Sequence, residues 1–227
     1  MYRERPSRIP HAVVWSSTVR SAESHRVLPD GCLDLLWSNG RLTVAGPDTV
    51  AHIASWRPGT PFVGLRLASG AGPRVLGLPA HELRDQRVRL DELWPAAQVR
   101  RLTERLAEAS DPGGLLEAVA QGRLAAAAPA DPVVERVAER LGQGSTVGEV
   151  ADEVGLSPRQ LHRRSLDAFG YGPKTLARIL RLHRALELGR SGTAAAEAAY
   201  AAGYADQAHL SREVRSLTGV TLTTLVA

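Results

Sequence analysis

The sequence is poor in the residues that form disulfides, membrane spans and common catalytic centres. Its one cysteine, Cys32, excludes an internal disulfide. No apolar run approaches the ~20 residues of a membrane span and no signal-peptide pattern opens the chain, so we expect a soluble cytoplasmic protein without membrane contact. Neither the Gly-x-Ser-x-Gly motif of hydrolases nor the His-Glu-x-x-His motif of zinc proteases occurs. These absences argue against an enzyme.

One pattern occurs twice in the last third of the chain. The first copy lies between Val150 and Gly170, and the second between Ala198 and Gly219. Gly155 corresponds to Gly203 and Arg163 to Arg212, so the second copy has one extra residue in its turn. Each copy predicts a helix, a tight turn and a second helix with exposed arginine, the arrangement with which proteins read the major groove of DNA.

The first copy carries the local signals that begin and end helices. Thr146 and Glu149 have the spacing of a capping box, and they predict a helix that runs to about Glu153. Gly155 can take the left-handed conformation that ends this helix. Ser157 is then placed to cap a second helix, with Pro158 at its first position.

The second helix of the first copy has two chemically different faces. At 100° per residue, one arc carries polar side chains and the other packs. The polar arc contains Arg159, Gln160, Arg163, Arg164 and Asp167. For one copy alone, a solvated arginine face would be the simpler interpretation. Two copies in matching register favour DNA binding instead.

The second copy is built from smaller residues. Its first helix, residues 194–199, is nearly all alanine, which favours helix but offers little volume to bury. Its second helix begins near Asp206, with Leu210, Val214 and Leu217 facing inward. The residues available outside are Gln207, Ala208, His209, Ser211, Arg212 and Arg215. Between the copies, a helix predicted from Lys174 to about Leu188 fixes their separation.

Positive charge is concentrated on the first recognition helix and the linker helix. The whole chain has a net charge of +4 and a pI of about 9.8. Residues 159–190 contain eight cationic and two acidic side chains, whereas residues 131–154 are net acidic. Arg178, Arg181 and Arg184 of the linker helix are equally consistent with phosphate contacts and with a solvated face.

The segment from Asp131 to Ala227 resembles the DNA-binding module of the AraC/XylS family of bacterial transcription regulators. The matching stretches are residues 155–163, 169–174 and 203–212. The resemblance implies seven helices, double-stranded DNA as partner, and two recognition helices in adjacent major grooves. Together with the outward faces, it gives these DNA-binding candidates: Ser157, Arg159, Gln160, Arg163, Arg164, Lys174, Asp206, Gln207, Ala208, His209, Ser211, Arg212 and Arg215. RNA polymerase is a further candidate partner.

The chain departs from the family at two points. Ser165 stands where relatives usually have Phe, an anchor that Phe169 replaces in part, and Leu222 stands where the second unit usually has Pro. These changes weaken the expected packing rather than the resemblance. Some proteins with such modules are DNA-repair methyltransferases, but those need a zinc-binding cysteine cluster that one Cys does not supply.

The first part of the chain predicts different secondary structure from the last third. Short β-prone runs fill residues 1–72, with a hairpin signal at Asn39–Gly40, and a helical pattern follows over residues 73–128. We therefore expect an α+β protein with a regulatory domain at 1–128 and a DNA-binding domain at 131–227. Residues 28–37, with their Pro-Asp-Gly-Cys motif, 44–47 and 64–66 resemble the N-terminal domain that precedes many AraC-type modules. That resemblance implies a small β-barrel, cupin-like, with a helical subdomain.

Two interpretations remain open for the conspicuous residues of this domain. In the first, Trp15, Trp37 or Trp56 lines a pocket for a small-molecule effector and Arg66 holds an anion. In the second, the tryptophans fill the core and Arg66 pairs with a structural carboxylate, Asp30 or Asp34. Cys32 is either a reactive sensor or an inert buried thiol, which is the more common state of a lone Cys between apolar neighbours.

No cofactor or metal is expected. His11, His25 and His52 lack the tight His-x-His spacing of cupin metal sites. The alternative to a sensor is a ligand-independent module for protein interaction or dimerisation, and the sequence does not distinguish a monomer from a homodimer. A ligand-dependent shift in melting temperature separates the two functions.

Overall fold

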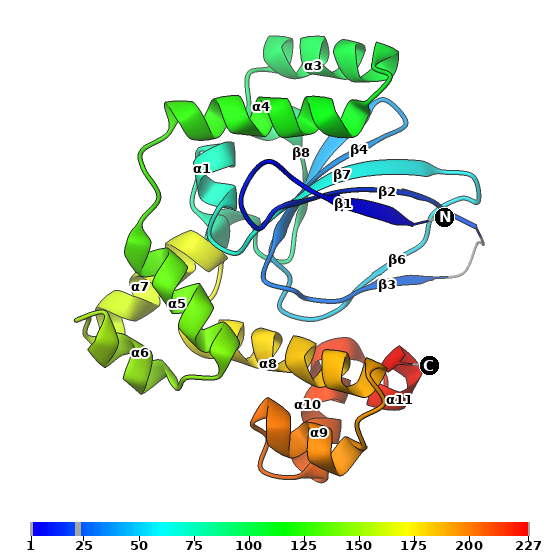
Figure 1. The fold of residues 1–227 in the computed structure, drawn as a ribbon. Coiled ribbons are helices and arrows are strands. Elements are labelled where there is room, and N and C mark those ends of the chain that lie inside the picture. The colour runs from blue at the N-terminus through cyan, green and yellow to red at the C-terminus, as the bar shows by residue number, and fades with distance from the viewer. Residues whose placement is uncertain (1, 21–23, 227) are drawn as a thin grey trace.

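The computed structural model describes residues 2–20 and 24–226, and it has the predicted α+β composition (Figure 1). Met1 and Ala227, the outer ends of the two predicted domains, lie outside the described residues. A sheet forms most of the first third of the chain, and helices form the last two fifths. No helix in the described ranges is long and apolar enough to cross a membrane.

The principal sheet is antiparallel and has six strands. Its order is β1 (Arg3–Pro6), β2 (Val13–Thr18), β7 (Pro61–Leu67), β4 (Leu33–Ser38), β5 (Arg41–Ala45) and β8 (Arg87–Arg89). A separate ribbon pairs β3 (His25–Val27) with β6 (His52–Ala54). The predicted barrel is therefore corrected to an open sheet, because the short edge strands β1 and β8 do not pair with each other.

The predicted hairpin at Asn39–Gly40 is confirmed between β4 and β5. Asn39 has φ 47° and Gly40 has φ 74°, and positive φ at both central residues matches the twist of the flanking strands. The alternation along the strands then sets the two faces of the sheet. Leu35 and Leu65 face the buried core, whereas Leu36 and Gly64 belong to the opposite face.

Helices cover the core face of the sheet. They are α1 (Gly72–Leu76), the 3₁₀ turn η1 (Ala80–Leu83), α2 (Leu90–Leu93), α3 (Ala96–Glu108) and α4 (Pro112–Ala126). Leucines of α3 and α4 share one apolar cluster with the sheet. The predicted helical stretch is interrupted by β8, whose three residues are too few to give a recognisable alternation.

Seven helices follow within the described residues 132–226, the number that the resemblance implied. They are α5 (Pro132–Gln143), α6 (Val147–Glu153), α7 (Pro158–Phe169), α8 (Pro173–Arg190), α9 (Ala195–Ala202), α10 (Gln207–Thr218) and α11 (Leu222–Val226). The predicted linker helix is α8, whose 18 residues give a length of about 27 Å. In Figure 1, α8 runs from the α5–α7 group to the α9–α11 group.

Candidate nucleic-acid interface

Helices α6 and α7 form the first helix-turn-helix unit, and the local signals of the sequence are confirmed. Thr146 and Glu149 make a complete capping box on α6, with Glu149 Oε2 accepting the Thr146 N–H at 2.7 Å. Gly155 has φ 64° in the turn. Ser157 and Gln160 make a second capping box on α7, with Pro158 in its first turn.

Arg159 and Arg163 are the free cations of α7. Both side chains are exposed, and neither has a hydrogen bond or ion pair with any residue that the structure describes. Arg164 differs, because its guanidinium lies 3.0 Å from Asp131 Oδ2 at the start of α5. The Oε1 atom of Gln160 accepts from Ser157 N at 2.9 Å and from Ser157 Oγ at 2.8 Å, which leaves its NH₂ group for other partners.

The inner face of α7 accounts for the unusual Ser165. Ser165 is 1% exposed and lies between the buried residues Leu161 and Phe169. Phe169 is also 1% exposed and packs with Val134 of α5 in the cluster of the first unit. Phe169, one turn after Ser165, therefore contributes a buried aromatic side chain to the packing of this helix.

Helices α9 and α10 form the second unit. Asp206 caps α10, because its Oδ1 accepts the His209 N–H at 2.6 Å, and His209 also lies edge-on to the Tyr204 ring at 5.3 Å. Ser211 Oγ donates to Gln207 O at 2.8 Å. Three of the predicted DNA-binding residues thus have roles within the helix. The exposed members without a side-chain partner in the described part of the chain are Gln207, Ala208, Arg212 and Arg215.

The arginines of α8 contact the second unit, an arrangement that the sequence did not indicate. Arg178 forms two hydrogen bonds with Glu213 of α10, and the Arg181 guanidinium lies 5.4 Å from the centre of the Tyr204 ring. Arg184 donates to Ala202 O, at the end of α9, at 3.1 Å. Lys174, at the start of α8, remains exposed and without a described partner.

The first domain contacts the C-terminal ends of both recognition helices. At α7, a Cβ built on Gly170 would lie 2.5 Å from Pro47 Cγ, and His81 Nδ1 lies 3.3 Å from Asp167 Oδ1. At α10, the Ala51 N–H donates to Leu217 O at 2.7 Å. The Arg26 guanidinium donates to Thr218 O. Cations and N–H donors stabilise helix C-termini, so these contacts are favourable for α10.

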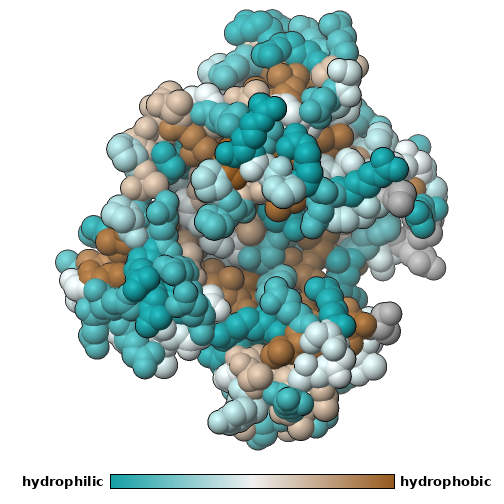
Figure 2. All heavy atoms as spheres, viewed as in Figure 1, coloured by the Kyte–Doolittle hydropathy of each residue, from teal (hydrophilic) through white to brown (hydrophobic). Residues whose placement is uncertain are grey.

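The Pro-Asp-Gly-Cys motif meets the linker helix between these two points. His183 Nε2 lies 2.7 Å from Pro29 O. Gly31 has φ 80°, and a Cβ there would lie 2.8 Å from Ser69 Oγ and 3.3 Å from Leu176 Cδ1. In Figure 2, hydrophobic residues are visible in the recess between the sheet and α8, while hydrophilic residues cover much of the first unit. Nothing in the local pattern of the motif indicated this contact.

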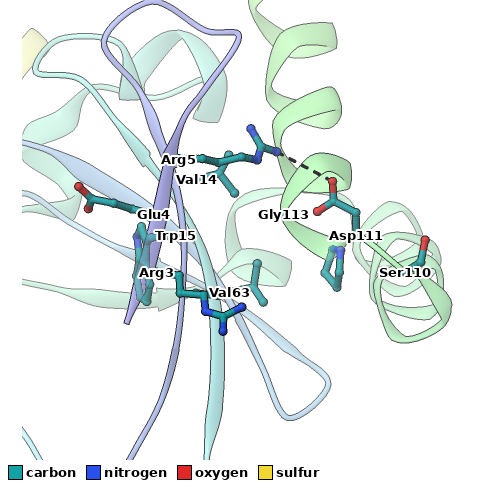
Figure 3. Close-up of a pocket in the computed structure, with 11 residues that line it drawn as sticks. Arg3, Glu4, Arg5, Val14, Trp15, Val63, Ser110, Asp111 and Gly113 are labelled. Atoms are coloured by element: carbon teal, nitrogen blue, oxygen red, sulfur yellow. Dashed lines mark ion pairs between the residues drawn. The ribbon is translucent and has the colours of Figure 1, made fainter. Parts of the chain in front are cut away.

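Trp15, Trp37 and Trp56, the three tryptophans predicted as pocket candidates, are not brought together. Trp15 lies over Gly64, donates to Asp34 Oδ1 at 2.7 Å and lines a cavity of about 360 Å³ between β1 and the start of α4 (Figure 3). Trp37 packs against the core on the opposite face of the sheet. Trp56 stacks on His25 with 5.3 Å between the ring centres, and it is in tilted contact with Phe62 at 4.8 Å.

Arg66 and Cys32 match the second interpretation, in which Arg66 pairs with a carboxylate of the domain and Cys32 is an unreactive thiol. Arg66 Nε lies 3.2 Å from Asp30 Oδ2 and 3.6 Å from Asp34 Oδ2. Burial lowers the pKa of Arg66, but Asp34 and Asp30 outweigh it, so the pKa is raised and the side chain stays charged. Burial, with Asp30 and Asp34, raises the pKa of Cys32, which keeps the thiol protonated and poorly nucleophilic. Within the described ranges, no three His, Cys, Asp or Glu side chains gather as a metal would require.

Two family models match the chain. A helix-turn-helix domain matches residues 150–227, and a domain of unknown function matches residues 11–89. The first match begins within α6 and covers the remainder of both units described above. No curated protein is similar enough to match. The C-terminal segment is therefore a helix-turn-helix domain of the AraC type.

Solved structures are similar to parts or all of this chain. The apo ToxT K231A structure from Vibrio cholerae has a TM-score of 0.51 at 11% identity, with 97% of this chain and 98% of that chain covered. A probable AraC family transcriptional regulator from Rhodopseudomonas palustris has a TM-score of 0.38 at 23% identity, with 42% of this chain and 95% of that chain covered. The ToxT likeness, which spans both parts of the chain, shows a shared fold.

Proposed function

We propose that this chain is a DNA-binding transcription regulator whose AraC-type helix-turn-helix domain reads two adjacent major grooves of one DNA site. Helix α7 enters one groove and α10 the next. In this proposal the base readers are Arg159, Arg163 and the Gln160 amide in the first unit, with Gln207 and Arg212 in the second. The proposed phosphate contacts are Lys174, Arg215 and Arg164, the last in exchange for its ion pair with Asp131.

The observation that carries this proposal is the contrast between free and tethered arginines. Arg159 and Arg163 on α7, and Arg212 on α10, are exposed without partners among the described residues, whereas Arg178 and Arg184 on α8 are tied to the second unit. Guanidinium groups on the outer faces of paired helix-turn-helix units are available for bidentate bonds to guanine.

We further propose that residues 131–227 bind DNA and that residues 1–128 control them in response to a small molecule, without catalysis. Support comes from the contacts of Ala51 and Arg26 with α10 and of Pro47 with the end of α7. Because residues 1–128 contact the ends of both recognition helices, a change in the conformation of this domain can change the relative position of the two helices. The alternative is a ligand-independent dimerisation module, for which a melting temperature unaffected by any ligand is the signature.

A binding map of genomic DNA, followed by footprinting of the strongest site, tests the proposal. We expect two protected stretches roughly 10 bp apart on one face of the duplex. Binding should fall steeply with salt, because Lys and Arg displace counterions from phosphates. Protection of a single stretch, or equal affinity for unrelated sequences, would contradict the two-groove reading.

A further inference from the structure

A second, larger cavity lies on the face of the sheet that the helices leave uncovered. Its volume is about 790 Å³, within the range of ligand pockets, which is about 300–1,000 Å³. The sheet contributes Leu36 and Phe62 to its wall, and the segment after β6 contributes Trp56. The cavity therefore lies between the six-stranded sheet and the β3–β6 ribbon.

The lining combines an aromatic wall with cations. Trp56 and Phe62 are in tilted contact at 4.8 Å, and Arg41, Arg57 and Arg87 also face the cavity. The charge of Arg87 is neutralised by Asp48: Arg87 Nη1 donates to Oδ1 at 2.8 Å and Nη2 donates to Oδ2 at 2.6 Å. Arg41 and Arg57 have no partner among the described residues, and no described carboxylate lines the cavity. Its charge is thus uncompensated and positive.

The ribbon that borders this cavity also contacts α10. His52 lines the cavity, and the preceding residue, Ala51, donates its N–H to Leu217 O of α10. Across the ribbon, Arg26 pairs in register with Ile53 and donates to Thr218 O. A movement of the ribbon toward or away from the sheet therefore changes two hydrogen bonds at the end of the second recognition helix.

We propose that this cavity binds an anion with a planar apolar body, stacked on Trp56 and Phe62 and held by Arg41 and Arg57, and that the ribbon transmits its binding to α10. The proposal rests on control of the regulator by a small molecule, and it names the class of molecule, the site and the route. Planar rings match the aromatic wall, and an anionic group offsets the two unpaired guanidinium groups.

Tryptophan fluorescence titrations of the full chain test the site. The probes are 2-naphthoate and 2-naphthyl phosphate, with neutral 2-naphthol as the matched control. We expect saturable binding of at least one anion and at least tenfold weaker binding of 2-naphthol. Arg41→Ala and Arg57→Ala should each weaken anion binding at least fivefold, whereas Arg100→Ala on the exposed face of α3 should not change it.

DNA affinity measured with and without the bound anion tests the route. We expect at least a threefold change in Kd for the native chain and none for Arg26→Ala, which should still bind the anion. If neither anion binds, or if Arg41→Ala and Arg57→Ala bind it normally, the site is wrong even where DNA binding is intact. If the anion binds but DNA affinity is unchanged, the route is wrong. A chain that binds the anion and no DNA would instead overturn the proposed function.

Discussion

Arg178 of α8 and Glu213 of α10 face each other in a bidentate ion pair, with 2.8 Å between Nε and Oε2 and 3.1 Å between Nη2 and Oε1. The pair ties the linker helix to the second recognition helix. It lowers the pKa of Glu213 through the hydrogen bonds from Arg178. The orientation of α10 against α8 therefore depends on this contact as well as on apolar packing.

A double-mutant cycle with Arg178→Ala and Glu213→Ala should give a coupling free energy of about 0.5–1 kcal/mol in urea unfolding. This is the range for a partly exposed pair with good geometry. The same cycle with Arg100→Ala in place of Arg178→Ala is the control and should give no coupling. Equal coupling in the two cycles would show that the ion pair does not stabilise the fold.

Arg163→Ala should weaken binding to the preferred DNA site by about 1–3 kcal/mol and relax the preference at one base pair, because a bidentate contact to guanine is lost. Binding to a panel of sites with single base changes measures this. Equal weakening on every sequence would identify Arg163 as a phosphate contact. Arg100→Ala on α3 is the matched control and should leave the panel unchanged.

Arg212→Ala tests whether α10 reads bases. We expect loss of protection over the second stretch of the footprint, while the first stretch, bound by α7, is retained. Total affinity should fall by about 1–3 kcal/mol if the contact is to a base edge. An unchanged footprint would mean that the second unit does not read bases at this position.

Gly31→Ala should destabilise the protein by more than Gly40→Ala. Both glycines have positive φ, 80° and 74°, so each substitution incurs the left-handed penalty of about 1–2 kcal/mol. A Cβ at Gly31 would also lie 2.8 Å from Ser69 Oγ, whereas nothing lies within 4 Å of one at Gly40. The difference between the two melting curves measures the packing of the Pro29–Gly31 loop. An equal decrease in melting temperature for the two variants would show that the Pro29–Gly31 loop accommodates the added methyl group without cost.

Glu117 should make stability depend on pH in the acid range. Its side chain is 1% exposed, and its Oε1 accepts from Ser7 Oγ at 2.7 Å and from Arg8 N at 2.5 Å. Burial raises the pKa of Glu117, but the hydrogen bonds from Ser7, Arg8 and Arg5 outweigh it, so the pKa lies below its ordinary 4.5.

A lowered folded-state pKa means that the Glu117 carboxylate stabilises the fold above about pH 4.5 and that this contribution is lost as pH falls through the folded-state value. Glu117→Gln should therefore lower the free energy of unfolding by about 2–3 kcal/mol at pH 7, because partners of the buried carboxylate are left unpaired. The variant should also lose less stability than the native chain as the pH falls into the acid range. Urea unfolding between pH 3 and 7 measures both effects. Glu104→Gln, on the exposed side of α3, should retain the native profile.

The sequence predicts the parts of this fold that short-range chemistry decides. Thr146 with Glu149 predicts the capping box on α6, and Ser157 followed by Pro158 predicts the start of α7, because these residues act on helix N–H groups within three residues. The part that Gln160 takes in the box on α7 is known from the structure alone. The Asn39–Gly40 turn is equally local. The repeat then follows from equivalent residues, such as Gly155 and Gly203, at which both units turn.

What the sequence does not show depends on contacts between distant segments. Arg26 and Thr218 are 192 positions apart, and no periodicity relates them. Arg178 and Arg184 look like a solvated face because their partners belong to α10 and α9. Trp15 and Trp37 lie on opposite faces of the sheet because of the register of β2 and β4. That register depends on the pairing of both strands with β7, which the sequence alone does not give.

The continuity of α8 restricts how this protein can change over evolution. Each residue of an α-helix adds about 1.5 Å and turns the chain by about 100°. A single insertion within α8 would swing the second unit about a quarter of the way around the helix axis, away from the DNA that the first unit holds. Changes of a whole turn, three or four residues at a time, preserve the facing of the two units. Among related proteins, the distance between the two half-sites of the DNA should therefore differ by discrete amounts that correspond to whole helical turns of α8.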